Sequence, residues 1–562
     1  MLTRQSGLAW RLSDGLAQAC PPGEISSGRE PESRAWPGGC PGNRTLADPT
    51  PQPSLFDEGP FAPCPAPFNM AAHTLAAAAI TPEKVALEVI AGPGAVAARW
   101  THGELAEAVR RTAAGLAAAG IRPGDRMLLR LGNSAEFPIL FFAAIALGAV
   151  PAPASPQLTR AEVAAILADL DPALVALGAG LDLPPGVACP VIGPAEIAAL
   201  GRHPPRRFAA TMPDDPAFIV YTSGTSGRPK GVLHAQRAAW ARRMMWQGWY
   251  GLKPDDRVLH AGAFNWTYTL GAGLTDPWAA GATALIHAGP PDRHVWPRLA
   301  AAHGATIFAA VPGVYRQMLD APGLAEGFAG LRHGLSAGEA LAETVAETWS
   351  RATGRPIYQA LGMSEISTYI SFSPEDPPVP GRSGRPQRGR RVAILGETGD
   401  APLPRGTDGL LAVGRRDPGL MLGYWRRPEE TAAAFRGEWF LTGDRARMAA
   451  DGTITHLGRA DEVMNAGGYR VAPQEVEAAL LRHPGVAEAA VVDLPVRDGV
   501  SIIAAFFVPA GDAPEAAALA RHCEGLLARY KCPREFHAVA NLPRGSNGKL
   551  IRRKLRDVRG GM

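Results

Sequence analysis

The apolar positions of this chain follow two spacings in turn, one typical of helices and one typical of strands. From Gly103 to Gly120 they recur three and four positions apart, which is the period of an amphipathic helix. Short apolar runs at Arg126 to Leu131 and Ala217 to Tyr221 are typical of buried strands. Helices alternating with strands favour parallel sheets covered by helices. We therefore predict an α/β fold from about Phe68 onward.

The pattern changes near Gly458, where a Gly-rich region ends. A helix candidate at Pro473 to Arg482 precedes strand candidates at Ala487 to Leu494 and Ser501 to Val508. This order predicts a small α+β unit after the α/β region. We expect a large N-terminal domain over residues 53–459 and a C-terminal domain over residues 460–562.

Two segments depart from these patterns. Residues 1–52 are dense in Pro, Gly, Ser and Arg, and we expect a disordered extension there. Acidic residues such as Asp14 and Glu24 argue against an organellar transit peptide. The apolar run from Phe137 to Ala154 approaches membrane-spanning length but contains Pro138, Pro151 and Pro153. It is interpreted as a buried helix that leads into a core strand.

Composition narrows the class of protein. The 562 residues suffice for roughly three or four domain-sized units. Apolar residues make up 46% and charged residues 20%, the balance of a folded globular protein. A net charge of +4 gives no global attraction to nucleic acid or anionic lipid. The six cysteines form no CxxC pair, which indicates a reduced, cytoplasmic setting without a structural metal.

The most informative stretch is Tyr221 to Gly231, with the sequence YTSGTSGRPKG, directly after the apolar strand. Its hydroxyls, glycines and lysine can surround phosphate oxygens with donors. The pattern GxxxxGK[ST] of the common nucleotide loop cannot be laid on it. The alternative is a surface linker, which would need no preceding buried strand. The predicted phosphate-binding residues are Thr222, Ser223, Gly224, Thr225, Ser226, Gly227 and Lys230.

This loop resembles the signature of the adenylate-forming (AMP-binding) superfamily, which holds acyl-CoA synthetases, aryl-CoA ligases, peptide-synthetase adenylation domains and firefly luciferase. Similar motifs recur in the family's order over about residues 55–560. They are LSAGEAL at Leu335 to Leu341, YQALGMSE at Tyr358 to Glu365, WFLTGD at Trp439 to Asp444, the segment Gly458 to Glu477, and LPRGSNGK at Leu542 to Lys549. The resemblance implies parallel sheets flanked by helices and a small, mobile α+β C-terminal domain.

The resemblance also implies roles for residues on the nucleotide side. Gly338 and Glu339 would lie beside adenine, Ser364 would contact the α-phosphate, and Glu365 would help to hold Mg²⁺. A carboxylate suits a hard dication. Leu361 stands where the family often has an aromatic residue that stacks on adenine, so we expect shape and apolar contact to hold the base. Taken without its neighbours, Glu365 would be interpreted as an ordinary surface carboxylate.

The later motifs imply residues that act on the ribose, the phosphates and the thiol. Asp444 would accept hydrogen bonds from the ribose hydroxyls, for which an acceptor-only carboxylate is suited. Lys549 would neutralise the substrate carboxylate and the α-phosphate, although it could instead belong to a basic tail. The other implied residues are Arg459 at the ribose, Arg470 near the phosphates, Asp461 as the hinge, and Gly467, Gly468 and Tyr469 along the thiol's tunnel.

A pocket for the acyl group is expected to include Phe264, Asn265, Trp266, Leu361 and Gly362. The stretch FNWTYTLG looks closer to acetyl- and medium-chain acyl-CoA synthetases, with some likeness to benzoate-CoA ligases, than to long-chain enzymes. Because large aromatic side chains limit the depth of a cavity, we expect a short, branched or aromatic acid. The alternative is that Phe264 and Trp266 are core residues.

The implied function is ATP-dependent activation of a carboxylic acid, followed by acyl transfer to coenzyme A, with Mg²⁺ as cofactor. Loading of a carrier-protein thiol is the alternative, although no carrier domain adjoins the motifs. A non-enzymatic scaffold would leave Glu365, Asp444 and Lys549 without a reason to occur together. The expected partners are the carboxylate, ATP and coenzyme A, with neither nucleic acid nor stable membrane insertion, and a homodimer is left open.

Overall fold

The computed structural model describes nine ranges of the chain. They are residues 52–223, 229–290, 292–460, 464–466, 469–471, 473–497, 500–527, 529–545 and 550–558. Almost all of the expected N-terminal extension therefore lies outside the described residues.

Helix α2 (His102–Ala118) illustrates how local sequence sets an element. The Thr101 side chain accepts from the backbone of Glu104, and the Glu104 side chain accepts from the backbone of Thr101. This capping box satisfies two donors at the helix start. Leu105 and Val109 lie on one face and are fully buried. The helix expected from Gly103 to Gly120 is thus confirmed.

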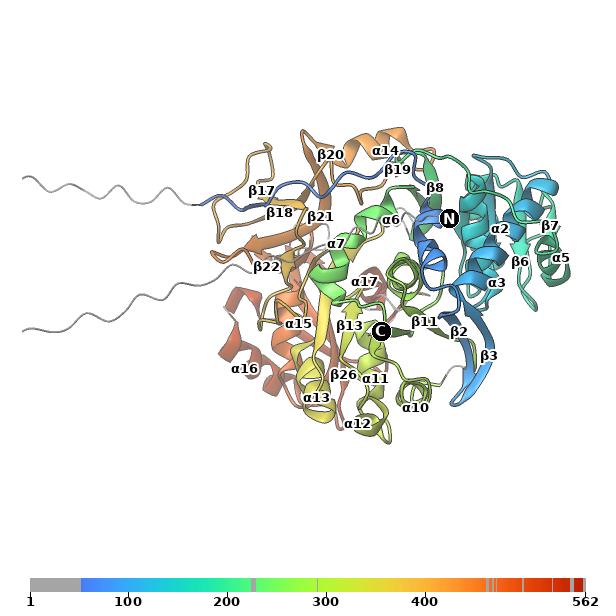
Figure 1. Ribbon diagram of the computed structural model, residues 1–562. Helices are drawn as coiled ribbons and strands as arrows, with labels where there is room; N and C mark the ends of the chain where they lie inside the picture. The colour runs from blue at the N-terminus through green and yellow to red at the C-terminus, as the bar shows by residue number, and fades with distance from the viewer. Residues whose placement is uncertain are drawn as a thin grey trace, which may run out of the picture. The chain divides into compact units, whose positions relative to one another are not determined.

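A four-stranded parallel sheet has the order β5-β4-β6-β7. Its strands are β4 (Arg126–Arg130), β5 (Val150–Pro153), β6 (Leu174–Leu177) and β7 (Val191–Ile192). Helices α2, α3 (Glu136–Leu147) and α5 (Pro194–Leu200) cover one face (Figure 1), and α4 (Arg160–Leu170) packs on the other. Both faces are buried, as in other parallel sheets.

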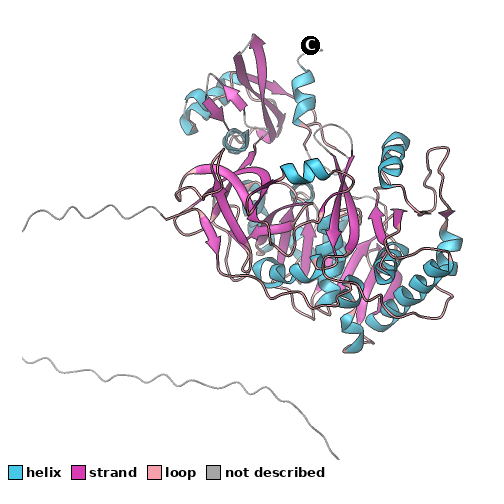
Figure 2. Cartoon of the chain, turned by 90° about the horizontal axis from the view of Figure 1, so that it is seen from above, coloured by secondary structure: helices cyan, strands magenta, loops and turns pink. Residues whose placement is uncertain are grey.

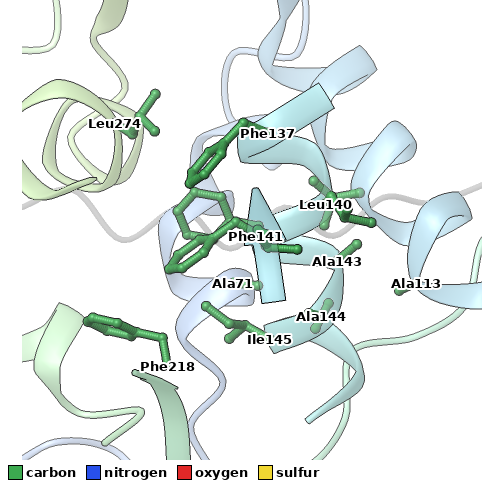
Figure 3. Packing of buried hydrophobic residues seen from close by; sticks show 14 of the residues in the cluster. Ala71, Ala113, Phe137, Leu140, Phe141, Ala143, Ala144, Ile145, Phe218 and Leu274 are labelled. Atoms are coloured by element: carbon green, nitrogen blue, oxygen red, sulfur yellow. The ribbon is translucent and has the colours of Figure 1, made fainter. Parts of the chain in front are cut away.

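Helix α3 and strand β5 account for the long apolar run in the sequence. Figure 3 shows Phe137 and Phe141 pointing toward Leu274 and Phe218, whereas Leu140 points to the opposite side of α3. The helix is apolar all round because both of its sides are packed against protein. The expectation of a buried helix followed by a core strand is confirmed. No helix among the described residues is long and apolar enough to cross a membrane.

A nine-stranded sheet has the order β16-β15-β14-β13-β12-β10-β11-β2-β3. Its six central strands run parallel and its edges are antiparallel. The strands are β2 (Val85–Gly92), β3 (Ala95–Thr101), β10 (Arg257–His260), β11 (Thr283–His287), β12 (Ile307–Ala310), β13 (His333–Ala337), β14 (Ile357–Met363), β15 (Ser367–Ser371) and β16 (Arg385–Pro386).

Helices cover both faces of this sheet, as Figure 2 shows for helices in cyan and strands in magenta. One face carries α10 (Val295–Ala302), α11 (Pro312–Met318), α12 (Leu324–Gly327) and α13 (Glu343–Thr353). The other faces α7 (Arg243–Met245) and two π-helical turns, at Trp246–Tyr250 and Gly271–Thr275. Helices α1 (Met70–Thr74), α6 (Ala238–Ala241), α8 (Thr267–Leu270) and α9 (Asp276–Ala279) complete this part of the chain.

Two antiparallel sheets were not expected from the apolar pattern. A six-stranded sheet contains β1 (Leu55–Asp57), β17 (Arg391–Leu395), β18 (Asp408–Gly414), β20 (Phe435–Arg436), β21 (Trp439–Met448) and β22 (Ile454–Arg459). A three-stranded sheet contains β8 (Pro216–Ser223), β9 (Pro229–Ala235) and β19 (Gly423–Tyr424). The few residues between β8 and β9 are too short for a parallel crossover. The apolar run of β8 therefore marked a strand but not its direction.

The last hundred residues form the smaller α+β unit that the sequence predicted. Strands β25 (Val486–Arg497) and β26 (Val500–Pro509) pair antiparallel, and β27 (Glu535–Ala538) pairs parallel with β26. Helices α15 (Pro473–Leu481) and α16 (Ala516–Leu526) pack on one face, and α17 (Arg552–Val558) packs on the other. A short hairpin of β23 (Met464–Ala466) and β24 (Tyr469–Val471) precedes them.

Candidate active site

The parallel strands of the nine-stranded sheet bring four motifs to one edge. Strands β10, β12, β13 and β14 run in the same direction, so the segments that follow them leave the sheet at their carboxyl ends. Those segments begin at Ala261, Val311, Gly338 and Ser364. In open α/β sheets the carboxyl edge is where ligands bind. Topology therefore gathers segments that lie a hundred residues apart in the chain.

Glu365 lies at the centre of a polar cluster at this edge. Its Oε1 accepts a hydrogen bond from the Tyr424 hydroxyl at 2.9 Å, and its backbone carbonyl accepts from the Met421 amide at 2.8 Å. Burial and the neighbouring Glu365 charge raise the pKa of Tyr424 well above its ordinary value. The phenol is therefore a fixed donor that holds one oxygen of the Glu365 carboxylate.

Lys230 joins the same cluster from β9. Its ammonium lies 2.6 Å from Glu430 Oε2 and 4.1 Å from the centroid of the Tyr424 ring. The hydrogen bond from Lys230 lowers the pKa of the Glu430 carboxyl. Because Glu430 is largely exposed, this ion pair is weak and its ammonium can exchange partners with a phosphate.

The ring of His234 lies against the backbone of Ser364 and stacks on Phe218 with 4.6 Å between the ring centroids. Burial lowers the pKa of His234 to about 4, so the imidazole is neutral near pH 7. The backbone on which Ser364 and Glu365 sit is thus held by a buried, uncharged ring.

Asp444 lies in β21 and is only 6% exposed. Its backbone partner across the ladder is Arg459 of β22, whose Nη1 lies 3.5 Å from Asp444 Oδ1 and donates to the Thr442 carbonyl at 2.9 Å. His456 Nε2 lies 3.4 Å from the same carboxylate oxygen. The two residues expected at the ribose are therefore neighbours because their strands pair.

The expected adenine-side residues follow β13. Gly338 has φ +98°, a left-handed conformation that a side chain rarely adopts. Arg544 donates hydrogen bonds from Nη1 to the Glu339 carboxylate at 3.2 Å and from Nη2 to Glu488 at 2.7 Å. Contact of Gly338 and Glu339 with ATP stays a prediction.

The expected acyl-pocket residues fall into two groups. Phe264 is 2% exposed and stacks on Phe137 with 4.9 Å between the centroids, which places it in the core as the alternative interpretation had it. Asn265 and Trp266 are half-buried just before α8. Leu361 and Gly362 flank an irregularity in the pairing of β14 with β15, and a β-carbon on Gly362 would lie 2.5 Å from the Ser367 carbonyl. A role of these residues in binding the acyl group stays a prediction.

The other expected site residues are described only in part or lie outside the described residues. Thr222 and the backbone of Ser223 end β8, and the backbones of Tyr469 and Arg470 lie in β24. Outside the described residues lie Gly224, Thr225, Ser226, Gly227, Asp461, Gly467, Gly468 and Lys549.

The donor set around Glu365 fits Mg²⁺ carried by a nucleotide rather than a metal caged by protein. No group of three or more His, Cys, Asp or Glu side chains that could hold a metal occurs in the part of the chain that the structure describes. Mg²⁺ commonly takes one or two protein carboxylates together with substrate phosphates and water. The single carboxylate of Glu365 beside the phosphate-loop strand matches that pattern.

The sequence analysis did not predict three residues that contact the expected site residues. Tyr424, Glu430 and His456 reach the site through strand pairing and helix placement, about sixty to ninety residues beyond Glu365. No spacing in the sequence links them to Glu365 or Asp444. Only the antiparallel pairing of β19 with β9 brings Tyr424 to Lys230.

Comparison with known proteins matches both regions of the chain. Residues 75–425 match the family model described as AMP-binding enzyme, and residues 475–549 match the AMP-binding enzyme C-terminal domain. The 3-hydroxybenzoate–CoA ligase of Aromatoleum sp. (strain CIB) is 31% identical over 82% of this chain and 91% of its own length. The benzoate–CoA ligase of Thauera aromatica is 35% identical over 82% of this chain and 91% of its own length.

A solved structure agrees with these matches. The anthranilate CoA ligase AuaEII in complex with anthranoyl-AMP superposes with a TM-score of 0.79 at 27% identity, covering 88% of this chain and 98% of that chain. The predicted α/β fold with a small C-terminal domain is thereby confirmed.

Proposed function

This chain belongs to the AMP-binding enzyme family, and from that premise we propose that it is a CoA ligase for an aromatic carboxylic acid. It is an AMP-forming acid–thiol ligase. ATP activates the acid as an acyl-adenylate with release of pyrophosphate, and coenzyme A then takes the acyl group and releases AMP. The observation that carries this function is the convergence of Glu365, Lys230 and Tyr424 at the carboxyl edge of the parallel sheet.

The aromatic substrate is the finer part of the proposal. Relatives over four fifths of this chain act on 3-hydroxybenzoate and on benzoate, and a structural neighbour holds anthranoyl-AMP. We assign Trp266, a half-buried residue six positions after β10, to the wall of the acyl pocket, because a planar apolar side chain suits an aryl ring. A long aliphatic chain would need a deeper apolar channel.

In the first half-reaction a carboxylate oxygen forms a bond to the α-phosphorus as the bond to pyrophosphate breaks. We assign Thr222, Ser223 and Lys230 to the phosphate oxygens, because β8 and β9, the strands in which these residues lie, flank the Gly-rich loop. Lys549 is assigned to the meeting point of the carboxylate and the α-phosphate. Preorganised donors of this kind stabilise charge as it spreads in the transition state.

Mg²⁺ supplies charge neutralisation on the phosphates when it is bound. Glu365 would hold it, with the Tyr424 hydroxyl fixing the orientation of the carboxylate. Asp444 would accept from the ribose hydroxyls while Arg459, 3.5 Å away, helps to hold that carboxylate in place.

In the second half-reaction the thiolate of coenzyme A attacks the acyl carbon and AMP leaves. We assign the hinge to Asp461 and the thiol's path to Gly467, Gly468 and Tyr469. Rotation of the small domain about the hinge would then remove Lys549 from the active site and bring the segment with the thiol's path to it. Neither half-reaction needs a side-chain nucleophile.

The test is ATP–pyrophosphate exchange with a panel of acids. We expect benzoate, hydroxybenzoates and anthranilate to support exchange at least tenfold better than acetate or palmitate, since an aryl pocket gains apolar contact with a ring. AMP release should then require coenzyme A. Preference for an aliphatic acid would contradict the proposal of an aromatic substrate. Release of AMP with an acyl-carrier protein but not with coenzyme A would contradict coenzyme A as the acceptor thiol.

A further inference from the structure

The loop that carries Ser364 and Glu365 rests on buried basic side chains. His234 lies against the backbone of Ser364, and Arg242 Nη1 donates to the Ser367 hydroxyl at 2.5 Å. Arg390 Nη2 donates to the Thr368 carbonyl at 3.0 Å. These contacts act on Ser364, which follows β14, and on Ser367 and Thr368, the first two residues of β15. Buried basic side chains thus contact the loop at both of its ends.

Arg242 is the most elaborately held of these groups. Its Nε lies 2.9 Å and 3.0 Å from the two carboxylate oxygens of Asp276, and its Nη2 lies 2.6 Å from Asp276 Oδ2. Tyr250 donates to Asp276 Oδ2 at 2.7 Å and accepts from Arg242 Nη2 at 2.9 Å. A buried guanidinium needs such partners, since an unpaired one would be strongly destabilising. One edge of the guanidinium is committed to Asp276 and Tyr250, and Nη1 is left to reach Ser367.

The backbone of a π-helical turn packs closely against this side chain. A β-carbon on Gly271 would lie 1.8 Å from Arg242 Nη2, so the π-helical turn approaches the guanidinium as closely as a glycine permits. π-Helical turns often occur at functional sites. The guanidinium is therefore held in position by the backbone as well as by its ion pair with Asp276.

Ser367 connects the fixed Arg242 side chain to the loop that carries Glu365. It has φ +69°, a left-handed conformation that is unusual for a residue other than glycine. It lies two residues after Glu365, and its carbonyl packs where a β-carbon of Gly362 would be. A strained residue persists only when its surroundings fix it. Arg242 supplies the side-chain bond that does so.

We propose that Arg242 is a positioning residue for nucleotide activation, which acts through Ser367 to hold the Glu365 loop in its metal-binding shape. The proposal rests on the proposed function, because it needs Glu365 to face MgATP. In this role Arg242 acts on the loop and not on the substrate. Its effect is to preorganise a carboxylate two residues away from its own contact, in the way that outer partners orient metal ligands.

The chain contains a matched control. Arg332 makes the same kind of paired contact with Asp256, at 3.0 Å and 2.6 Å, and Asp256 is also buried. These two residues immediately precede β13 and β10, so their pair lies at the amino edge of the parallel strands. Loss of this pair should affect folding without affecting the Glu365 loop.

The decisive variant is Ser367→Gly, tested beside Ser367→Ala, Arg242→Met and Arg332→Met. Glycine relieves the positive φ while removing the hydroxyl, so we expect the melting temperature to stay within about two degrees of wild type. Pyrophosphate exchange should fall about tenfold. Calorimetry in the absence of the carboxylic acid substrate should show weaker binding of ATP in Mg²⁺, but unchanged binding of ATP in EDTA. Thioester formation from a supplied acyl-adenylate should be spared.

The other variants separate positioning from folding. Ser367→Ala keeps the strained φ and should lose both stability and exchange. If Arg242→Met folds, it should lose the Mg²⁺ dependence of ATP binding, whereas Arg332→Met should retain that dependence at a comparable loss of melting temperature. The proposal is overturned if Ser367→Gly exchanges at the wild-type rate, or if its ATP binding weakens equally in Mg²⁺ and in EDTA. Absence of exchange in the wild-type protein with every acid would instead overturn the proposed function itself.

Discussion

The hydrogen bond between Tyr424 and Glu365 can be removed while almost everything around it is kept. In Tyr424→Phe the ring remains, so Lys230 keeps its position 4.1 Å from the ring centroid. The change deletes only the hydroxyl that donates to Glu365 Oε1 at 2.9 Å. The carboxylate keeps its charge but loses the donor that fixes its orientation.

The size of the effect follows from the chemistry of that bond. A hydrogen bond to an ionised group contributes about 1.5–3 kcal/mol. Glu365 is half-buried, so water can replace the phenol in part and the lower end applies. A loss of about 1.5 kcal/mol corresponds to a factor of about ten in rate or affinity. Tyr424→Leu also removes the ring beneath Lys230, which should cost a further factor of about two to five.

Pyrophosphate exchange at varied Mg²⁺ is the suitable assay. Tyr424→Phe should need about tenfold more Mg²⁺ for half-maximal exchange and approach the wild-type rate at saturation. In a Glu365→Gln background the same change should have little further effect, because both substitutions act on one interaction. Full additivity of the two changes, or a Mg²⁺ requirement within twofold of wild type, would refute the idea that Tyr424 works through Glu365.

The remaining predictions concern the metal ligand, the mobile lysine and acid stability. Glu365→Gln should bind ATP but exchange pyrophosphate slowly even in excess Mg²⁺, because an amide is a poorer ligand for a hard cation, and wild-type rates would remove it from the metal site. Lys549→Ala should slow adenylate formation on the order of a hundredfold, yet make acyl-CoA normally from a supplied acyl-adenylate, and equal damage to both steps would count against that division of labour. Stability, measured as the urea midpoint, should fall as the pH drops from about 6.5 toward 4, because burial keeps several histidines neutral in the folded protein and the unfolded chain binds more protons. Substituting His260 by Asn should make that fall shallower, and an unchanged slope would contradict the assignment. The histidines whose pKa is lowered most are His73, His234 and His333, each to about 4, and His260, to about 3.

The elements with a strong local signal were predictable. Helix α2 followed from its apolar stripe, and α3 with β5 followed from a long apolar run broken by proline. Two strands of the small C-terminal unit, β25 and β26, were predicted within a few residues of their observed ends, whereas β23, β24 and β27 were not predicted. These features depend on contacts within a few residues of the chain, which the order of side chains states directly.

The antiparallel sheets were harder to predict. An apolar run shows that a strand is buried, but its neighbour and direction depend on which distant segment packs beside it. Strand β8 was therefore recognised as a strand, yet its antiparallel pairing with β9 was not. The six-stranded sheet draws on strands from residue 55 to residue 459, and no local pattern joins them.

The amino-acid sequence determined the family, the reaction class and the identity of the motif residues, because a motif fixes the order of chemical groups along a short stretch. Tertiary structure alone decided which other residues serve those groups. Tyr424, Glu430 and the Arg242–Asp276 pair come within hydrogen-bonding distance of the site or its supporting loop only after strands and helices far apart in the chain have packed together. Hydrogen bonds and ion pairs act over a few ångströms in space, whatever the separation along the chain, so their partners are set by the fold and not by spacing in the sequence.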